Sequence, residues 1–138
     1  MNTLDFEPLD PDEFGFRGFR LLIDGQYIYS VPGCTFGELS YWEFADDLGL
    51  EDESVSSQKI HRVVGVCDCG FAGCGATWAR VEKHDGIVTF SEFSGFQNPQ
   101  ESPTLTFDRE NYEAVIARMR ILTAKYQQLD ARSKGEAE

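Results

Sequence analysis

Two Asp-Gly dipeptides, Asp24-Gly25 and Asp85-Gly86, each stand between segments rich in β-branched and aromatic residues. A two-residue Asp-Gly loop readily adopts the positive φ angles that a tight hairpin requires. Each dipeptide therefore predicts two antiparallel strands in a fixed register. The first hairpin covers residues 14–31, and its loop pairs Leu22 with Tyr27.

Residues 60–93 are predicted to form a three-stranded meander, because a glycine-rich turn, GFAG, precedes the second Asp-Gly loop. The GFAG turn pairs Gly65 with Trp78, which leaves room for the indole over the glycine. The Asp-Gly loop pairs Val81 with Phe90. Side chains alternate between the two faces of a strand. One face then collects the predicted core residues Val64, Val66, Ala79, Val81, Val88 and Phe90.

Two helices are predicted. The first is short, covers residues 38–48 and ends at Gly49. The second follows Asp108, a favourable N-cap, and covers residues 109–132. Apolar side chains recur along it at steps of three and four residues, which is typical of one buried face. They are Tyr112, Val115, Ile116, Met119, Leu122, Tyr126 and Leu129.

These elements predict an α+β fold. An antiparallel sheet of about five to six strands, made by the N-terminal hairpin and the meander, is packed by the long C-terminal helix. The 138 residues suffice for one core, so residues 1–138 are expected to form a single domain. Residues 1–12 and 133–138 are expected to be flexible ends.

The N-terminal sequence has no basic region followed by an apolar run, and the chain has no stretch of about eighteen apolar residues. A cytoplasmic location without membrane contact is therefore expected. Reduced thiols follow from that location, which makes a disulfide framework improbable.

The net charge of −12 disfavours binding to nucleic acid or to anionic lipid. Residues 1–58 hold thirteen acidic and two basic residues, a formal charge of −11, and leave only −1 for residues 59–138. Solubility is one explanation of this asymmetry. The other is a surface that binds a basic protein.

The segment YWEFADDLGLEDE, residues 41–53, combines aromatic and acidic side chains. Its aromatic residues can be core and its acids a solvated helix face. Alternatively, aromatic anchors supply binding energy and carboxylates steer a basic partner. The predicted partner-binding residues are Trp42, Glu43, Asp46, Asp47, Glu51, Asp52 and Glu53.

Three cysteines form the pattern C-x-C-x4-C in the first turn of the meander, and the predicted register places them on one face. Converging thiolates can bind Zn²⁺, with Cys34 the best candidate for a fourth ligand. Buried packing beside Trp78 is the alternative. A redox role is disfavoured because Asp68 raises thiol pKa values. The predicted zinc ligands are Cys67, Cys69, Cys74 and Cys34.

The segments VGVCDCGFAGCGATW, VTFSEF and LTFDRENYEA resemble those of small uncharacterised bacterial proteins with a C-x-C-G-x-x-G-C-G hairpin, over about residues 60–115. This resemblance implies a bacterial origin and no activity. In size and charge the chain is similar to immunity and inhibitor proteins. The sequence therefore predicts a non-enzymatic protein that neutralises a basic toxin or enzyme. A zinc-stabilised domain and a thiol-based redox protein are the alternatives.

Overall fold

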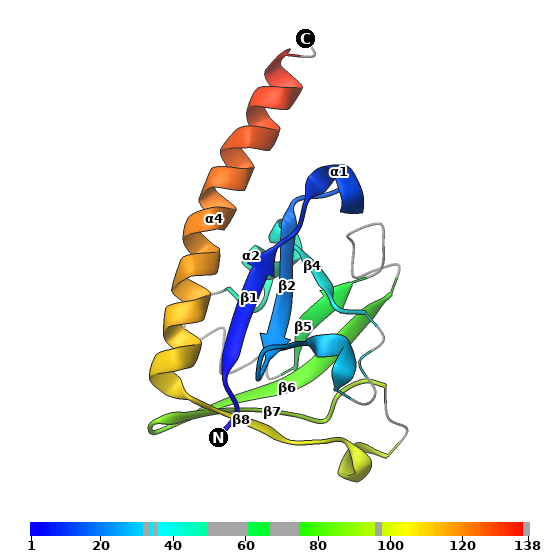
Figure 1. Ribbon diagram of the computed structural model, residues 1–138, viewed down its shortest axis with the longest axis vertical. Helices are drawn as coiled ribbons and strands as arrows, with labels where there is room; N and C mark the ends of the chain where they lie inside the picture. The colour runs from blue at the N-terminus through cyan, green and yellow to red at the C-terminus, as the bar shows by residue number, and fades with distance from the viewer. Residues whose placement is uncertain (32–33, 35, 50–60, 67–74, 96–97, 137–138) are drawn as a thin grey trace.

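An antiparallel sheet packs against a long C-terminal helix in the computed structural model of the chain (Figure 1). The described residues are 1–31, 34, 36–49, 61–66, 75–95 and 98–136. The predicted α+β class is therefore confirmed. The strands, helices and 3₁₀ turns are β1 (Leu4–Pro8), α1 (Pro11–Phe14), β2 (Gly18–Ile23), β3 (Gln26–Tyr27), η1 (Ile28–Ser30), β4 (Glu38–Ser40), α2 (Tyr41–Asp46), β5 (His61–Val66), β6 (Ala76–His84), β7 (Ile87–Ser91), η2 (Pro99–Glu101), β8 (Leu105–Asp108) and α4 (Arg109–Glu136).

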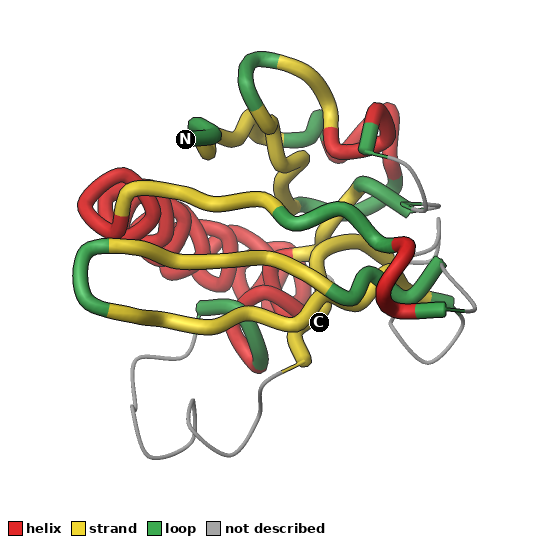
Figure 2. Tube along the Cα trace, turned by 90° about the horizontal axis from the view of Figure 1, so that it is seen from below, coloured by secondary structure: helices red, strands yellow, loops and turns green. Residues whose placement is uncertain are grey.

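The main path of the sheet runs β1-β2-β4-β5-β6-β7-β8, and β3 pairs with β2. The two ends of this path come together, because Asn2 forms a parallel bridge with Phe107 of β8. The Asn2 backbone N–H donates to the Thr106 carbonyl at 2.7 Å, and the Thr106 N–H donates to Asn2 Oδ1 at 3.0 Å. The sheet therefore curves round so that its first and last strands meet near the start of α4 (Figures 1 and 2).

Both Asp-Gly hairpins form as predicted. Asp24 and Gly25 have φ angles of 54° and 79°, and Leu22 pairs with Tyr27. The second loop pairs Val81 with Phe90, also as predicted. The first hairpin is shorter than expected, because its second strand gives way to η1 after two residues.

The register predicted for the first hairpin of the meander is wrong. Gly65 pairs with Thr77, one residue from its predicted partner, and a bulge between Val63 and Gly65 shifts the register by one more residue, so that Trp78 pairs with Val63. Gly65 does not make room for Trp78. A side chain at position 65 would instead collide with the backbone carbonyl of Phe36.

Two further expectations need correction. The predicted helix 38–48 is shorter, because residues 38–40 form β4 between β2 and β5, and only α2 is helical. The N-terminal residues, expected to be flexible, form β1 and α1. β1 pairs along its whole length with β2, and Asp10 caps α1 by accepting from the Asp12 backbone N–H at 2.9 Å.

Helix α4 covers one face of the sheet with the apolar side chains predicted for that role (Figure 2). Tyr112, Val115, Ile116 and Met119 are buried, whereas the more C-terminal members of the stripe are only partly covered. Asp108 caps the helix, since its Oδ1 accepts from the Glu110 N–H at 2.9 Å. The helix continues to residue 136, beyond the predicted end. The core beneath it also takes in the predicted sheet residues Val64, Val66, Ala79, Val88 and Phe90.

The structure gives no sign of a transmembrane helix in the part of the chain that it describes. No helix there is both long enough and apolar enough to cross a bilayer.

Candidate protein-binding site

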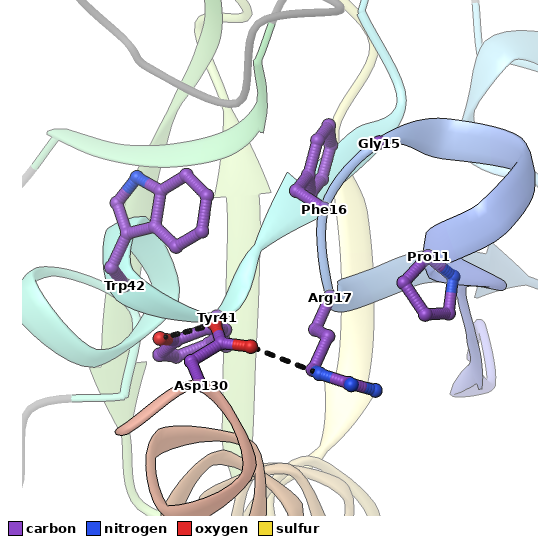
Figure 3. Close-up of a pocket in the computed structure, with 7 residues that line it drawn as sticks. All are labelled: Pro11, Gly15, Phe16, Arg17, Tyr41, Trp42 and Asp130. Atoms are coloured by element: carbon purple, nitrogen blue, oxygen red, sulfur yellow. Dashed lines mark hydrogen bonds and ion pairs between the residues drawn. The ribbon is translucent and has the colours of Figure 1, made fainter. Parts of the chain in front are cut away.

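A pocket of about 550 Å³ opens between α1, α2 and the C-terminal part of α4 (Figure 3). Such a volume is within the range of roughly 300–1,000 Å³ typical of ligand sites. Three separate segments of the chain build it. Its lining residues are Pro11, Gly15, Phe16, Arg17, Tyr41, Trp42 and Asp130.

Asp130, on α4, connects the three segments. Its Oδ1 lies 3.0 Å from Arg17 Nε, and its Oδ2 accepts from the Tyr41 hydroxyl at 2.8 Å. Burial and the hydrogen bond to this carboxylate raise the pKa of Tyr41 to about 12. The tyrosine therefore stays a hydrogen-bond donor throughout the physiological range and keeps Asp130 in position.

Aromatic rings form one side of the pocket. The ring of Tyr41 meets that of Trp42 edge to face, with centroids 5.2 Å apart, and Phe16 meets Trp42 in the same manner at 5.9 Å. Phe16 is buried, whereas Trp42 is half-buried. The indole therefore has a fixed orientation while part of its surface remains accessible.

Two of the helices that line this pocket, α1 and α2, also carry exposed acidic residues. Asp12 and Glu13 are exposed on α1, between the lining residues Pro11 and Gly15. Asp46 is exposed on α2 one turn after Trp42, and residues four apart share a helix face. Among the described residues, none of these three carboxylates has an ion-pair partner within 4 Å. They can therefore attract a basic partner.

The structure separates the predicted binding residues into two groups. Trp42 lines the pocket, Glu43 is half-buried beside it in sequence, and Asp46 is exposed. Asp47 is buried, with its side chain only 3% exposed. Its inclusion among the surface residues is therefore wrong.

Asp47 is buried because it joins α2 to β5. Its Oδ1 lies 3.4 Å from a terminal nitrogen of Arg62, and its Oδ2 accepts from the Val63 N–H at 3.2 Å. The same Arg62 nitrogen donates to the Asp47 backbone carbonyl at 2.6 Å. Asp47 thus has a structural role.

Arginines also neutralise other acids of the N-terminal half. Arg20 lies 3.2 Å from Glu7 and 3.5 Å from Glu38, and Arg118 of α4 lies 3.0 Å from Asp5. The acidic surface is therefore smaller than the formal charge suggests. In the described part of the chain, the exposed acids without an ion pair include Asp12, Glu13 and Asp46 on α1 and α2, and also Asp24, Asp85, Asp108 and Glu110 elsewhere.

The acidic residues Glu51, Asp52 and Glu53 and the cysteines Cys67, Cys69 and Cys74 lie outside the described residues. Cys34 is described and buried, and burial raises its thiol pKa to about 11. Within the described residues, no three His, Cys, Asp or Glu side chains gather as a metal site would require.

Sequence reasoning found Trp42 but missed the residues that complete its pocket. Asp130 is 89 positions from Tyr41 and 113 from Arg17. Its only local signal is an acidic residue at the end of an amphipathic stripe, directly after Leu129. Nothing in that pattern identifies its partners.

Comparisons with protein-family models, with curated proteins and with solved structures found no match.

Proposed function

We propose that the chain is a non-enzymatic binding protein that covers a basic surface of another protein, as an immunity or inhibitor protein does. The observation that carries this proposal is the pocket itself. It presents an aromatic side chain that is fixed but accessible, Trp42, and the helices that line it, α1 and α2, carry the exposed acids Asp12, Glu13 and Asp46. Tryptophans of this kind contribute much of the affinity at protein interfaces, and surrounding charges accelerate association.

The charge distribution supports the same function. Several acids of the N-terminal half are paired within the molecule: Glu7 of β1 and Glu38 of β4 with Arg20, and Asp47, just after α2, with Arg62. The helices that carry Asp12, Glu13 and Asp46, α1 and α2, meet the C-terminal part of α4 at the pocket, toward the end of the sheet away from the N-terminus (Figure 1). A basic partner would therefore dock at that end, where the chain offers both negative charge and aromatic surface.

The test begins with a partner isolated on the immobilised protein at 50 mM salt and released at 500 mM salt. The partner is then produced in pure form, and its affinity and activity are measured with the wild-type chain. We expect a Kd that weakens as salt rises, and loss of the partner's activity when it is bound.

Two variants locate the interface. Trp42→Ala should weaken binding at least tenfold, and charge reversal at Asp12, Glu13 and Asp46 should slow association and reduce its salt dependence. Trp78→Ala is the matched control, because Trp78 is the chain's other tryptophan and is 36% exposed on β6, outside the pocket. An affinity unaffected by both sets of changes, or equally reduced by Trp78→Ala, would contradict the proposal.

A further inference from the structure

We infer that the pocket beside Trp42 receives an arginine side chain of the partner. This inference rests on the proposed function, which it makes specific. Its three elements are the aromatic rings, the Asp130 carboxylate and the exposed acids of α1 and α2, the two short helices that line the pocket. Each element favours a planar cation.

The rings provide the first argument. A guanidinium group is attracted to the face of an aromatic ring, most strongly to that of tryptophan. The pocket presents Trp42, with Phe16 and Tyr41 packed edge to face against it. Figure 3 shows Trp42 and Phe16 on the same side of Arg17 and Asp130, and Pro11 opposite Trp42. A planar group that enters the pocket between these side chains contacts aromatic rings on one side and the Asp130 carboxylate on the other.

The chain contains a site of the same chemistry within its own fold. The guanidinium of Arg20 lies over the rings of Phe14 and Tyr27, at 4.9 Å and 4.4 Å from their centroids. It also pairs with the carboxylates of Glu7 and Glu38. The pocket offers this combination of rings and carboxylate to an arginine from outside.

In the unbound protein, Arg17 forms an ion pair with the Asp130 carboxylate that the partner's arginine would bind. Its ion pair with Asp130 is about one third exposed on both sides, and such pairs contribute little to stability. The incoming guanidinium can therefore displace Arg17. Asp130 keeps its position when Arg17 is displaced, because the Tyr41 hydroxyl still donates to Asp130 Oδ2.

The charges near the opening of the pocket indicate whether it would bind a cation or an anion. The terminal nitrogens of Arg17 have no hydrogen-bond or ion-pair partner among the described residues and can hold an anion. However, the helices that line the opening carry the exposed acids Asp12, Glu13 and Asp46, and nearby negative charge disfavours an anion. The balance therefore favours a positively charged group.

The experiment uses the full chain with Trp78→Phe, so that Trp42 is the only fluorophore of its kind. The probe is methylguanidinium, titrated to 200 mM at constant ionic strength, with methylammonium and acetate as comparison ligands. We expect a saturable change in Trp42 fluorescence with a millimolar Kd, stronger for methylguanidinium than for methylammonium. Circular dichroism and the unfolding midpoint confirm that each variant is folded.

Two substitutions give opposite results if the inference is correct. Asp130→Asn keeps an acceptor for Tyr41 but removes the charge, so affinity for methylguanidinium should fall about tenfold. Arg17→Met removes the competitor, so affinity should rise severalfold. No saturation by methylguanidinium, an unchanged affinity in Asp130→Asn, or saturable acetate binding that requires Arg17 would each overturn the inference. If the proposed function is correct and this inference is wrong, a basic partner still binds through Trp42, but methylguanidinium does not bind. If the proposed function is wrong and this inference is correct, methylguanidinium still binds, but no basic partner does.

Discussion

The side-chain amide of Asn111 makes both hydrogen bonds that a neighbouring strand would make with Leu4. Asn111 Oδ1 accepts from the Leu4 N–H at 2.8 Å, and Asn111 Nδ2 donates to the Leu4 carbonyl at 2.9 Å. β1 is the first strand of the sheet, and its outer backbone groups need partners wherever they are shielded from water. The first turn of α4 therefore closes the edge of β1 and fixes the helix against the sheet.

Asn111→Ala should lower the free energy of unfolding by about 1–2 kcal/mol, because it removes two hydrogen bonds and leaves both backbone groups of Leu4 without them. Urea denaturation measures the loss. Glu110→Ala is the control, since Glu110 is exposed on the same helical turn and should change stability by less than about 0.5 kcal/mol. Equal stabilities for the two variants would contradict this role of Asn111.

The elements that could be predicted are those whose cause is local. The Asp-Gly hairpins depend on backbone angles at two adjacent residues, and α4 on its own apolar spacing. β1 was missed because its sequence, LDFEP, is short and its acids resemble those of a disordered end. Those acids are instead neutralised by Arg20 and by Arg118, which follow in sequence by 13 and 113 positions.

The rest of the site and the register of β5 depend on contacts between distant segments. The pocket exists only where Asp130 of α4 reaches Arg17 and Tyr41. The bulge in β5 places Gly65 against the backbone of Phe36. Neither contact leaves a periodic signal in the sequence.

Gly65→Ala tests the second of these contacts. A Cβ at position 65 would collide with the Phe36 carbonyl oxygen, a backbone atom that cannot rotate away. We expect a loss of roughly 2–3 kcal/mol, typical of overpacking in a dense interior. Urea denaturation measures the loss of stability, and the m-value shows whether the compactness of the fold is retained.

The matched control is Gly86→Ala, where a Cβ meets nothing within 4 Å but the backbone φ is +76°. Its cost should be about 1 kcal/mol, from backbone strain alone. The close approach of Phe36 to Gly65 would be refuted if the two substitutions were equally costly.

The adjacent acids Asp46 and Asp47 should behave differently. Asp47→Ala leaves the Arg62 guanidinium buried without its carboxylate, which should destabilise the fold by about 3 kcal/mol. Asp46→Ala should leave stability within about 0.5 kcal/mol of the wild type, because its side chain is exposed. Thermal and urea denaturation of the two variants provide the comparison.

A double substitution separates the charge from the packing. Asp47→Leu combined with Arg62→Met removes both charges and keeps side chains of useful volume. It should therefore be more stable than Asp47→Ala alone. If Asp47→Ala were no more harmful than Asp46→Ala, the buried pair would not stabilise the fold.

The thiol of Cys34 should make stability fall at alkaline pH. Burial raises its pKa from 9.0 to about 11, so between these values the unfolded chain loses a proton that the folded chain keeps. The stabilisation that comes from burying the neutral Cys34 thiol is therefore complete below pH 9 and is lost as the pH approaches 11. Relative to Cys34→Ala, the wild type should lose about 2 kcal/mol of stability between pH 8 and pH 10.5.

Val31→Ala is the control, at the buried residue whose carbonyl accepts from the Cys34 N–H. Its loss of stability relative to the wild type should not change with pH. A wild-type advantage over Cys34→Ala that stays constant across this range would show that the thiol is not buried in its neutral form.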